Sequence, residues 1–99
     1  MIKIQVNKND EIENIVISGH SGYDTEGHDI VCAGVSSIST TTVNAIISID
    51  DSAITYKVDK GYLKIIINKH TEVIDKLINN MLNLLKEMEN KYPKYIKIN

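Results

Sequence analysis

The residues best equipped for chemistry are a cysteine and a histidine placed close together in the chain. Cys32 is the only cysteine, and His20 is one of three histidines. A thiol with an imidazole in reach is the minimum equipment for nucleophilic catalysis, because the imidazole can take the thiol proton and deliver it to a leaving group. The alternative is that Cys32 is a small buried hydrophobe, which is the usual role of a lone cysteine.

Cys32 falls near the start of an expected helix. Asp29 is a good N-cap, so Cys32 becomes the third helical residue, where unpaired first-turn N–H groups and the helix dipole favour a thiolate. The Asp29 charge opposes a thiolate that lies close to it, and Asp29 helps only if it caps the backbone or orients a histidine. Ser36 lies one turn after Cys32 on the same face and could donate a hydrogen bond to the thiolate or to a substrate.

His20 ends an expected strand, so the strand end and the helix start can meet. Gly19 and Gly22 flank His20 and allow backbone amides to approach a substrate carbonyl. The segment from Gly19 to His28, which also contains Gly27, has no apolar period and is long for a connection, as functional loops often are. Its remaining polar side chains are interpreted as solvated: Tyr23, Asp24 and Glu26.

Other site hypotheses use the remaining histidines. His28 is a rival partner for Cys32, although a solvated loop histidine is the simpler interpretation. His70 is most simply a residue at the start of a later helix. A zinc site made of His20, His28, Asp29 and Cys32 has suitable ligand types, but structural zinc sites usually use several cysteines. We therefore expect no metal and no cofactor.

Alternating apolar residues predict two β-hairpins around the site. The first pairs Ile2–Val6 with a strand through Ile15 and Ile17, after turn residues at 8–10. The second pairs Ile54–Val58 with Leu63–Ile67 through an Asp-Lys-Gly turn, which is a strong hairpin signal.

One helix is expected after each hairpin. The first runs from Ile30 to about Ile49 with poor intrinsic propensity, so tertiary packing must hold it. Its expected buried face is Val31, Val35, Ile38, Thr42, Ile46 and Ile49. Thr71 caps the second helix, Pro93 stops it, and residues 95–98 can add a short final strand. The order β-β-α-β-β-α, with a possible final β, predicts an α+β fold. Residues 1–99 form one domain with a mostly antiparallel sheet of four to five strands and both helices on one face.

Composition excludes several classes of function. The net charge is −2, and all eleven basic residues are lysine, so the guanidinium forks and basic stripe of a nucleic-acid-binding protein are missing. The N-terminus does not resemble a signal peptide, and we expect no run long enough for a membrane span. A single cysteine cannot form an internal disulfide, which fits a reducing compartment. We expect a cytoplasmic protein without membrane or direct nucleic-acid contacts.

The residues around Cys32 resemble a known family. The motif is Gly19-His20, a glycine-containing loop, and then Gly27-x-Asp29-Ile30-Val31-Cys32-Ala33-x-Val35-Ser36. It is similar to the ribosomal-processing cysteine proteases of Firmicutes and related bacteria, and the resemblance covers essentially the whole chain in length and element order. Ser21 departs from the family pattern, which often has alanine after the histidine.

This resemblance implies a dimeric α/β fold and a cysteine endopeptidase with His20 and Cys32 as its dyad. Gly19, Asp29 and Ser36 match further motif positions, and the loop containing Gly22 and Gly27 would be a mobile gate over the site. The implied substrate is the precursor of large-subunit ribosomal protein twenty-seven, whose N-terminal extension is removed. The alternative function is a non-enzymatic, ribosome-associated peptide-binding module with a buried structural cysteine.

Overall fold

The computed structural model describes all of residues 1–99 and contains the expected elements in the expected order. The possible final strand is present as a three-residue strand. The elements are β1 (Ile2–Asn9), β2 (Glu11–Ser18), α1 (Ile30–Ile49), β3 (Ile54–Asp59), β4 (Tyr62–Ile67), α2 (Glu72–Lys91) and β5 (Ile96–Ile98).

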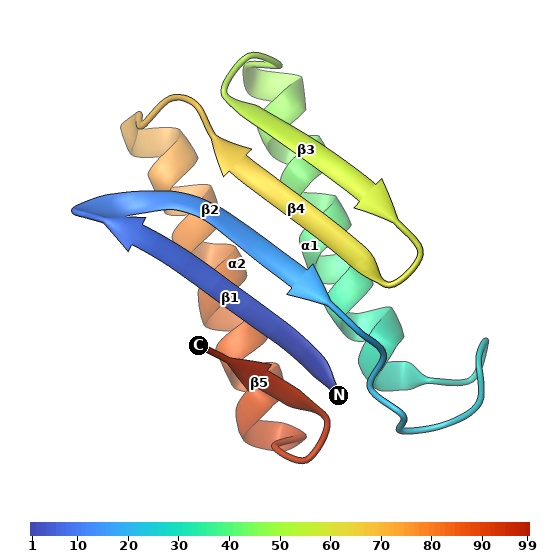
Figure 1. Ribbon diagram of the computed structural model, residues 1–99. Helices are drawn as coiled ribbons and strands as arrows, with labels where there is room; N and C mark the ends of the chain where they lie inside the picture. The colour runs from blue at the N-terminus through green and yellow to red at the C-terminus, as the bar shows by residue number, and fades with distance from the viewer.

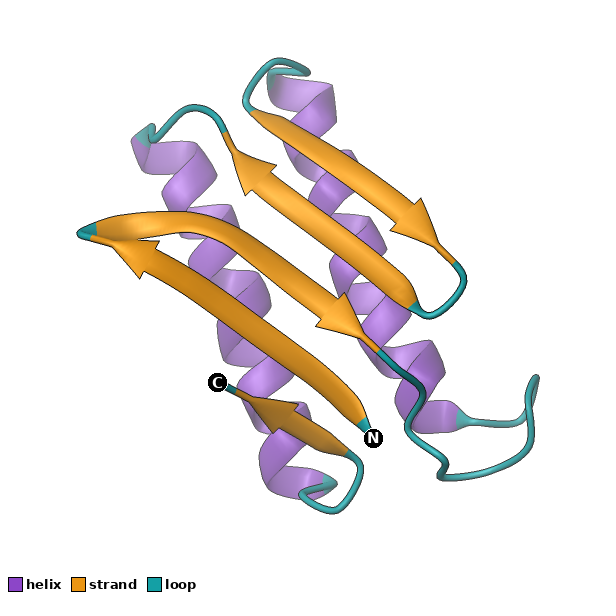
Figure 2. Cartoon of the chain, in the orientation of Figure 1, coloured by secondary structure: helices purple, strands orange, loops and turns teal.

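The five strands form one sheet in the order β3-β4-β2-β1-β5. The pairs β1–β2, β2–β4 and β3–β4 are antiparallel, and only β5 runs parallel to its neighbour β1. Both helices lie on the same face of the sheet, behind it in Figures 1 and 2. The predicted α+β architecture is therefore confirmed.

The core lies between this face of the sheet and the helices. Alternate residues of the strands point into it, which is the period expected for strands with one solvated face. In α2 the buried positions repeat at helical spacing: Ile74, Ile78, Met81 and Leu85. The hydroxyl of Thr71 accepts a hydrogen bond of 3.2 Å from the backbone N–H of Ile74, so the predicted cap of α2 is present.

Helix α1 contains no charged residue, and its buried face differs from the expected one. The buried residues are Val31, Val35, Ser39, Thr42, Val43 and Ile46. Ile49 is 58% exposed because it lies in the last turn, and Ile38 is only half-buried because the face is rotated toward Val43. The hydroxyls of Ser39 and Thr42 donate to backbone carbonyls one turn earlier, at 2.8 and 2.9 Å, which makes their burial tolerable.

Helix α1 also corrects the expectation that no run is long enough for a membrane span. By length and composition alone, Ile30–Ile49 passes that test, with a mean hydropathy of 1.6. Core helices of soluble proteins pass the same test, and α1 packs against α2 on the inner face of the sheet (Figure 1). Its role in this fold is to carry Cys32 at its first turn.

Candidate active site

A cavity of about 460 Å³ separates α1 from the β3–β4 hairpin, and both His20 and Cys32 line it. Besides Cys32, the helix contributes both polar and apolar side chains to the wall: Val35, Ser36, Ser39, Thr40, Val43 and Asn44. The sheet contributes mainly apolar and aromatic ones: Tyr56, Val58, Tyr62 and Leu63. A groove lined by both polar and apolar side chains can hold an extended peptide by its backbone and its side chains at the same time.

Cys32 is a free, half-buried thiol in the first turn of α1. Cys32 packs against the core but is not fully buried, and it also lines the cavity. Asp29 is the N-cap, as predicted, and its Oδ1 accepts hydrogen bonds of 3.0 Å from the backbone N–H groups of both Val31 and Cys32.

The sulfur of Cys32 contacts the residue that follows His20. The backbone N–H of Ser21 points at Sγ over 3.3 Å, and the Ser21 hydroxyl oxygen lies 3.6 Å from the same atom. No hydrogen bond joins His20 directly to Cys32, although the two residues share the cavity wall. In cysteine and serine enzymes without substrate, such catalytic contacts are often long.

Asp29 also organises the start of the loop. Its Oδ2 accepts from the hydroxyl of Ser21 and from the backbone N–H groups of Tyr23 and Asp24, at 3.1 and 3.4 Å. Partial burial raises the pKa of Asp29, but these hydrogen bonds together with the one from Cys32 outweigh it and lower the pKa to about 2. Asp29 makes no hydrogen bond to a histidine side chain, so of its two expected roles the structure contains only the cap, extended here to the loop.

His20 is exposed and lies where the end of β2 meets the N-terminus of β1. Gly19 has a φ of +95°, and a Cβ at this position would lie 2.5 Å from the carbonyl oxygen of Met1. Because that oxygen belongs to the backbone, it cannot move aside for a side chain. The Met1 nitrogen donates to the carbonyl of His20, so two backbone contacts fix the segment that carries the imidazole.

The remaining loop residues take different positions. Gly22 and Gly27 are exposed and adopt positive φ angles of 71° and 88°. Tyr23 is not simply solvated, because its ring packs edge-on against Tyr92 and Tyr95, with centroid distances of 5.7 and 5.2 Å. His28 is exposed and does not line the cavity. Of the two loop histidines, His20 is therefore the one that shares a cavity with Cys32.

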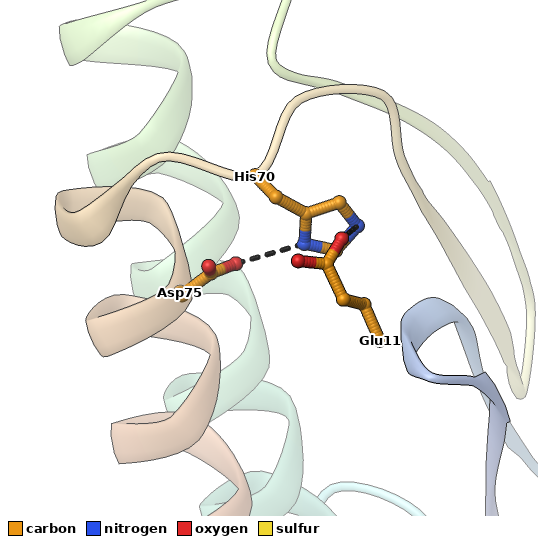
Figure 3. A group of neighbouring side chains, drawn as sticks. All are labelled: Glu11, His70 and Asp75. Atoms are coloured by element: carbon orange, nitrogen blue, oxygen red, sulfur yellow. Dashed lines mark hydrogen bonds and ion pairs between the residues drawn. The ribbon is translucent and has the colours of Figure 1, made fainter.

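The four residues of the hypothetical zinc site do not come together as ligands. The cluster of metal-ligating side chains in the structure is Glu11, His70 and Asp75, at the opposite end of the sheet from the start of α1. Figure 3 shows the His70 ring between the two carboxylates, with Nδ1 2.9 Å from Asp75 and Nε2 3.4 Å from Glu11. This cluster ties the β1–β2 turn to the first turn of α2.

Ser36 and Gly61 complete the cavity wall next to the predicted dyad. Ser36 is exposed on α1 and its hydroxyl makes no hydrogen bond within the protein, unlike those of Ser39 and Thr42. Gly61, in the β3–β4 turn, lies directly against the His20 ring. This contact could not be predicted from the sequence, because a turn glycine is expected in any tight hairpin.

The chain is similar to known proteins over its full length. Residues 1–97 match the model of the cysteine protease Prp family. The chain is 31% identical over 104 residues to the ribosomal processing cysteine protease Prp of Staphylococcus aureus, with 100% of this chain and 98% of that protein covered.

Solved structures agree with this similarity. The crystal structure of the essential ribosomal processing protease Prp from S. aureus with a covalently linked product peptide superposes with a TM-score of 0.93 at 29% identity, covering 100% of this chain and 98% of that one. The same protein with a substrate peptide gives 0.87 at 28% identity, with the same coverage. SMU.848 from Streptococcus mutans gives 0.84 at 27% identity, covering 99% and 91%.

Proposed function

Because this chain belongs to the cysteine protease Prp family, we propose that it cleaves peptide bonds with Cys32 as the nucleophile and His20 as the proton carrier. The family makes the chain a cysteine protease, and its S. aureus relative is a ribosomal processing protease. The observation that carries the assignment to these two residues is their place in one cavity, with the backbone of Ser21 between them and in contact with Sγ.

In the proposed reaction, the Cys32 thiolate attacks the scissile carbonyl carbon and forms a carbon–sulfur bond. The imidazolium of His20 then gives its proton to the amide nitrogen as the carbon–nitrogen bond breaks, and the C-terminal fragment leaves as an amine. A water molecule attacks the remaining thioester while His20 accepts its proton. Release of the N-terminal fragment as a carboxylic acid returns the thiolate to Cys32.

The negative oxygen of the tetrahedral intermediate needs hydrogen-bond donors near Sγ. The first-turn amides of α1 are already used, because those of Val31 and Cys32 bind Asp29 Oδ1 and that of Ala33 binds the Asp29 carbonyl. The N–H of Ser21, 3.3 Å from the sulfur, is better placed. We assign it as an oxyanion donor, with the unpaired hydroxyl of Ser36 available to the substrate backbone.

The proposed substrate is the precursor of large-subunit ribosomal protein twenty-seven, which the protein would trim at its N-terminal extension in the cytoplasm. The relatives' role in ribosomal processing supports this substrate class, and the groove between α1 and the β3–β4 hairpin offers room for an extended peptide. The experiment is to incubate the purified protein with the full-length precursor and to map new N-termini by mass spectrometry. We expect a single new N-terminus at the end of the extension, whereas an intact precursor would contradict the proposal.

We further propose that the protein acts as a homodimer. Helix α1 exposes apolar side chains at both ends, with Ile30 at 55% and Ile49 at 58% exposure, and no charge along its length would oppose a second copy. Light scattering across a wide concentration range should give a mass of about twice 11.1 kDa. A mass that stays near 11.1 kDa would contradict the dimer.

A further inference from the structure

The imidazole of His20 rests on a position that has no side chain. A Cβ built on Gly61 would lie 2.8 Å from Nε2 and 3.0 Å from Cε1 of His20. A separation below 3.0 Å, as to Nε2, is essentially never found for a Cβ, so any other residue at Gly61 would have to displace the ring. The ring thus occupies the space that a side chain would need.

The backbone of Gly61 also holds the segment that carries the ring. The N–H of Gly19 donates to the carbonyl of Gly61 over 2.9 Å, one step beyond the last paired residues of β2 and β4. The carbonyl oxygen of Gly19 would itself lie 3.6 Å from a Cβ on Gly61. The β3–β4 turn therefore touches both the backbone before His20 and the imidazole itself.

We propose that Gly61 is a positioning residue for catalysis: its missing side chain seats the His20 imidazole at the cavity wall that it shares with Cys32. This inference rests on the proposed function, because it assumes that His20 carries the proton. The β3–β4 hairpin, although far from Cys32 in the sequence, would then determine the position of the imidazole.

The expected effect is large because proton transfer depends strongly on geometry. A displacement of about 1 Å can cost on the order of 100-fold in rate. Substrate binding depends less on the ring position, since the groove walls formed by α1 and β3 are unchanged. The loss should therefore appear in kcat rather than in KM.

The experiment compares Gly61→Ala with Gly61→Asn. Gly61 has a φ of +66°, a backbone conformation that asparagine tolerates better than alanine. The two variants differ in backbone strain but share the Cβ that meets the ring. We expect kcat to fall about 10- to 100-fold in both, with asparagine recovering stability but not activity.

Asp10→Ala is the matched control for strain alone. Asp10 also has a φ of +66° in a hairpin turn, but it lies between β1 and β2 at the far end of the sheet. This variant should lose stability and keep the wild-type kcat. A direct readout of the ring is its NMR signal: the His20 ring resonances should shift in both Gly61 variants and stay in place in Asp10→Ala.

Each outcome decides one point. Wild-type kcat and unshifted His20 resonances in the Gly61 variants would overturn the positioning role. So would an equal loss of kcat in Asp10→Ala, because that would attribute the effect to strain. If, instead, Cys32→Ala retains full cleavage, the proposed function fails, and the Gly61 result is no longer needed to show it.

Discussion

Cys32→Ala should abolish cleavage of the ribosomal protein precursor, and His20→Ala should lower it by at least about 1,000-fold, while both variants remain folded. The physical reason is that alanine at position 32 removes the only nucleophilic sulfur in the chain. Alanine at position 20 removes the imidazole that shares the cavity with that sulfur. The measurement is the rate of appearance of the new N-terminus, with circular dichroism as the check on folding.

The other two histidines provide matched controls for this result. His28 is exposed and outside the cavity, and His70 lies at the opposite end of the sheet with Glu11 and Asp75 (Figure 3). His28→Ala and His70→Ala should retain cleavage within about threefold of wild type. Full activity of Cys32→Ala, or an equal loss in all three histidine variants, would contradict the assignment of the dyad.

Asp29→Ala should cause the second largest loss, in both stability and activity. The carboxylate caps α1 through Oδ1 and holds the segment 21–24 through Oδ2, and alanine removes both sets of hydrogen bonds. Loss of the cap alone costs about 0.5–2 kcal/mol. Because the Ser21 N–H that contacts Sγ belongs to the released segment, we expect kcat/KM to fall about 100-fold.

Asp29→Asn separates these two functions. The amide oxygen can still cap the helix, but an N–H₂ group in place of Oδ2 would face the donors of Ser21, Tyr23 and Asp24. This variant should therefore keep near-native helix stability and lose most of the activity. Equal activity of Asp29→Asn and wild type would show that the loop contacts do not matter for cleavage.

The pH dependence of stability follows from the same carboxylate. The pKa of Asp29 is lowered from 3.8 to about 2 in the folded protein, so its contribution is complete above pH 3.8 and is lost as the pH falls through about 2. The thermal midpoint of the wild type should drop over this range more steeply than that of Asp29→Asn. Asp50, whose pKa the Ser52 hydroxyl and Lys69 lower to about 2, contributes the same slope to both proteins.

Most of the fold could be predicted from local sequence patterns. The alternation in β1–β4 and the helix caps Asp29 and Thr71 each depend on only a few neighbouring residues. They can therefore be recognised directly in the sequence. The buried face of α1 was predicted less well, because which turn is covered depends on where the sheet ends rather than on helical spacing. Ile49 has the right spacing and is nevertheless exposed.

In the candidate site, too, the local features could be predicted from the sequence and the long-range contacts could not. Placing Cys32 in a capped first turn required only neighbouring residues, and the family motif selected His20. The contact between Gly61 and the His20 ring joins residues that are far apart in the chain, and a glycine in a hairpin turn looks the same whether or not a ring lies against it. Likewise, nothing local indicates that Tyr23 packs on Tyr92 and Tyr95.

This aromatic contact divides the loop before Cys32 into two mechanically different halves. The first half, through Asp24, is tethered twice: to Asp29 by hydrogen bonds and, through the Tyr23 ring, to the segment that joins α2 and β5. The second half, 25–28, has one exposed ion pair to the hairpin, between Glu26 and Lys60 at 3.4 Å. The half that holds the Ser21 amide against the sulfur is therefore anchored to the C-terminal end of the chain, whereas residues 25–28 are bound to the hairpin only by that exposed ion pair.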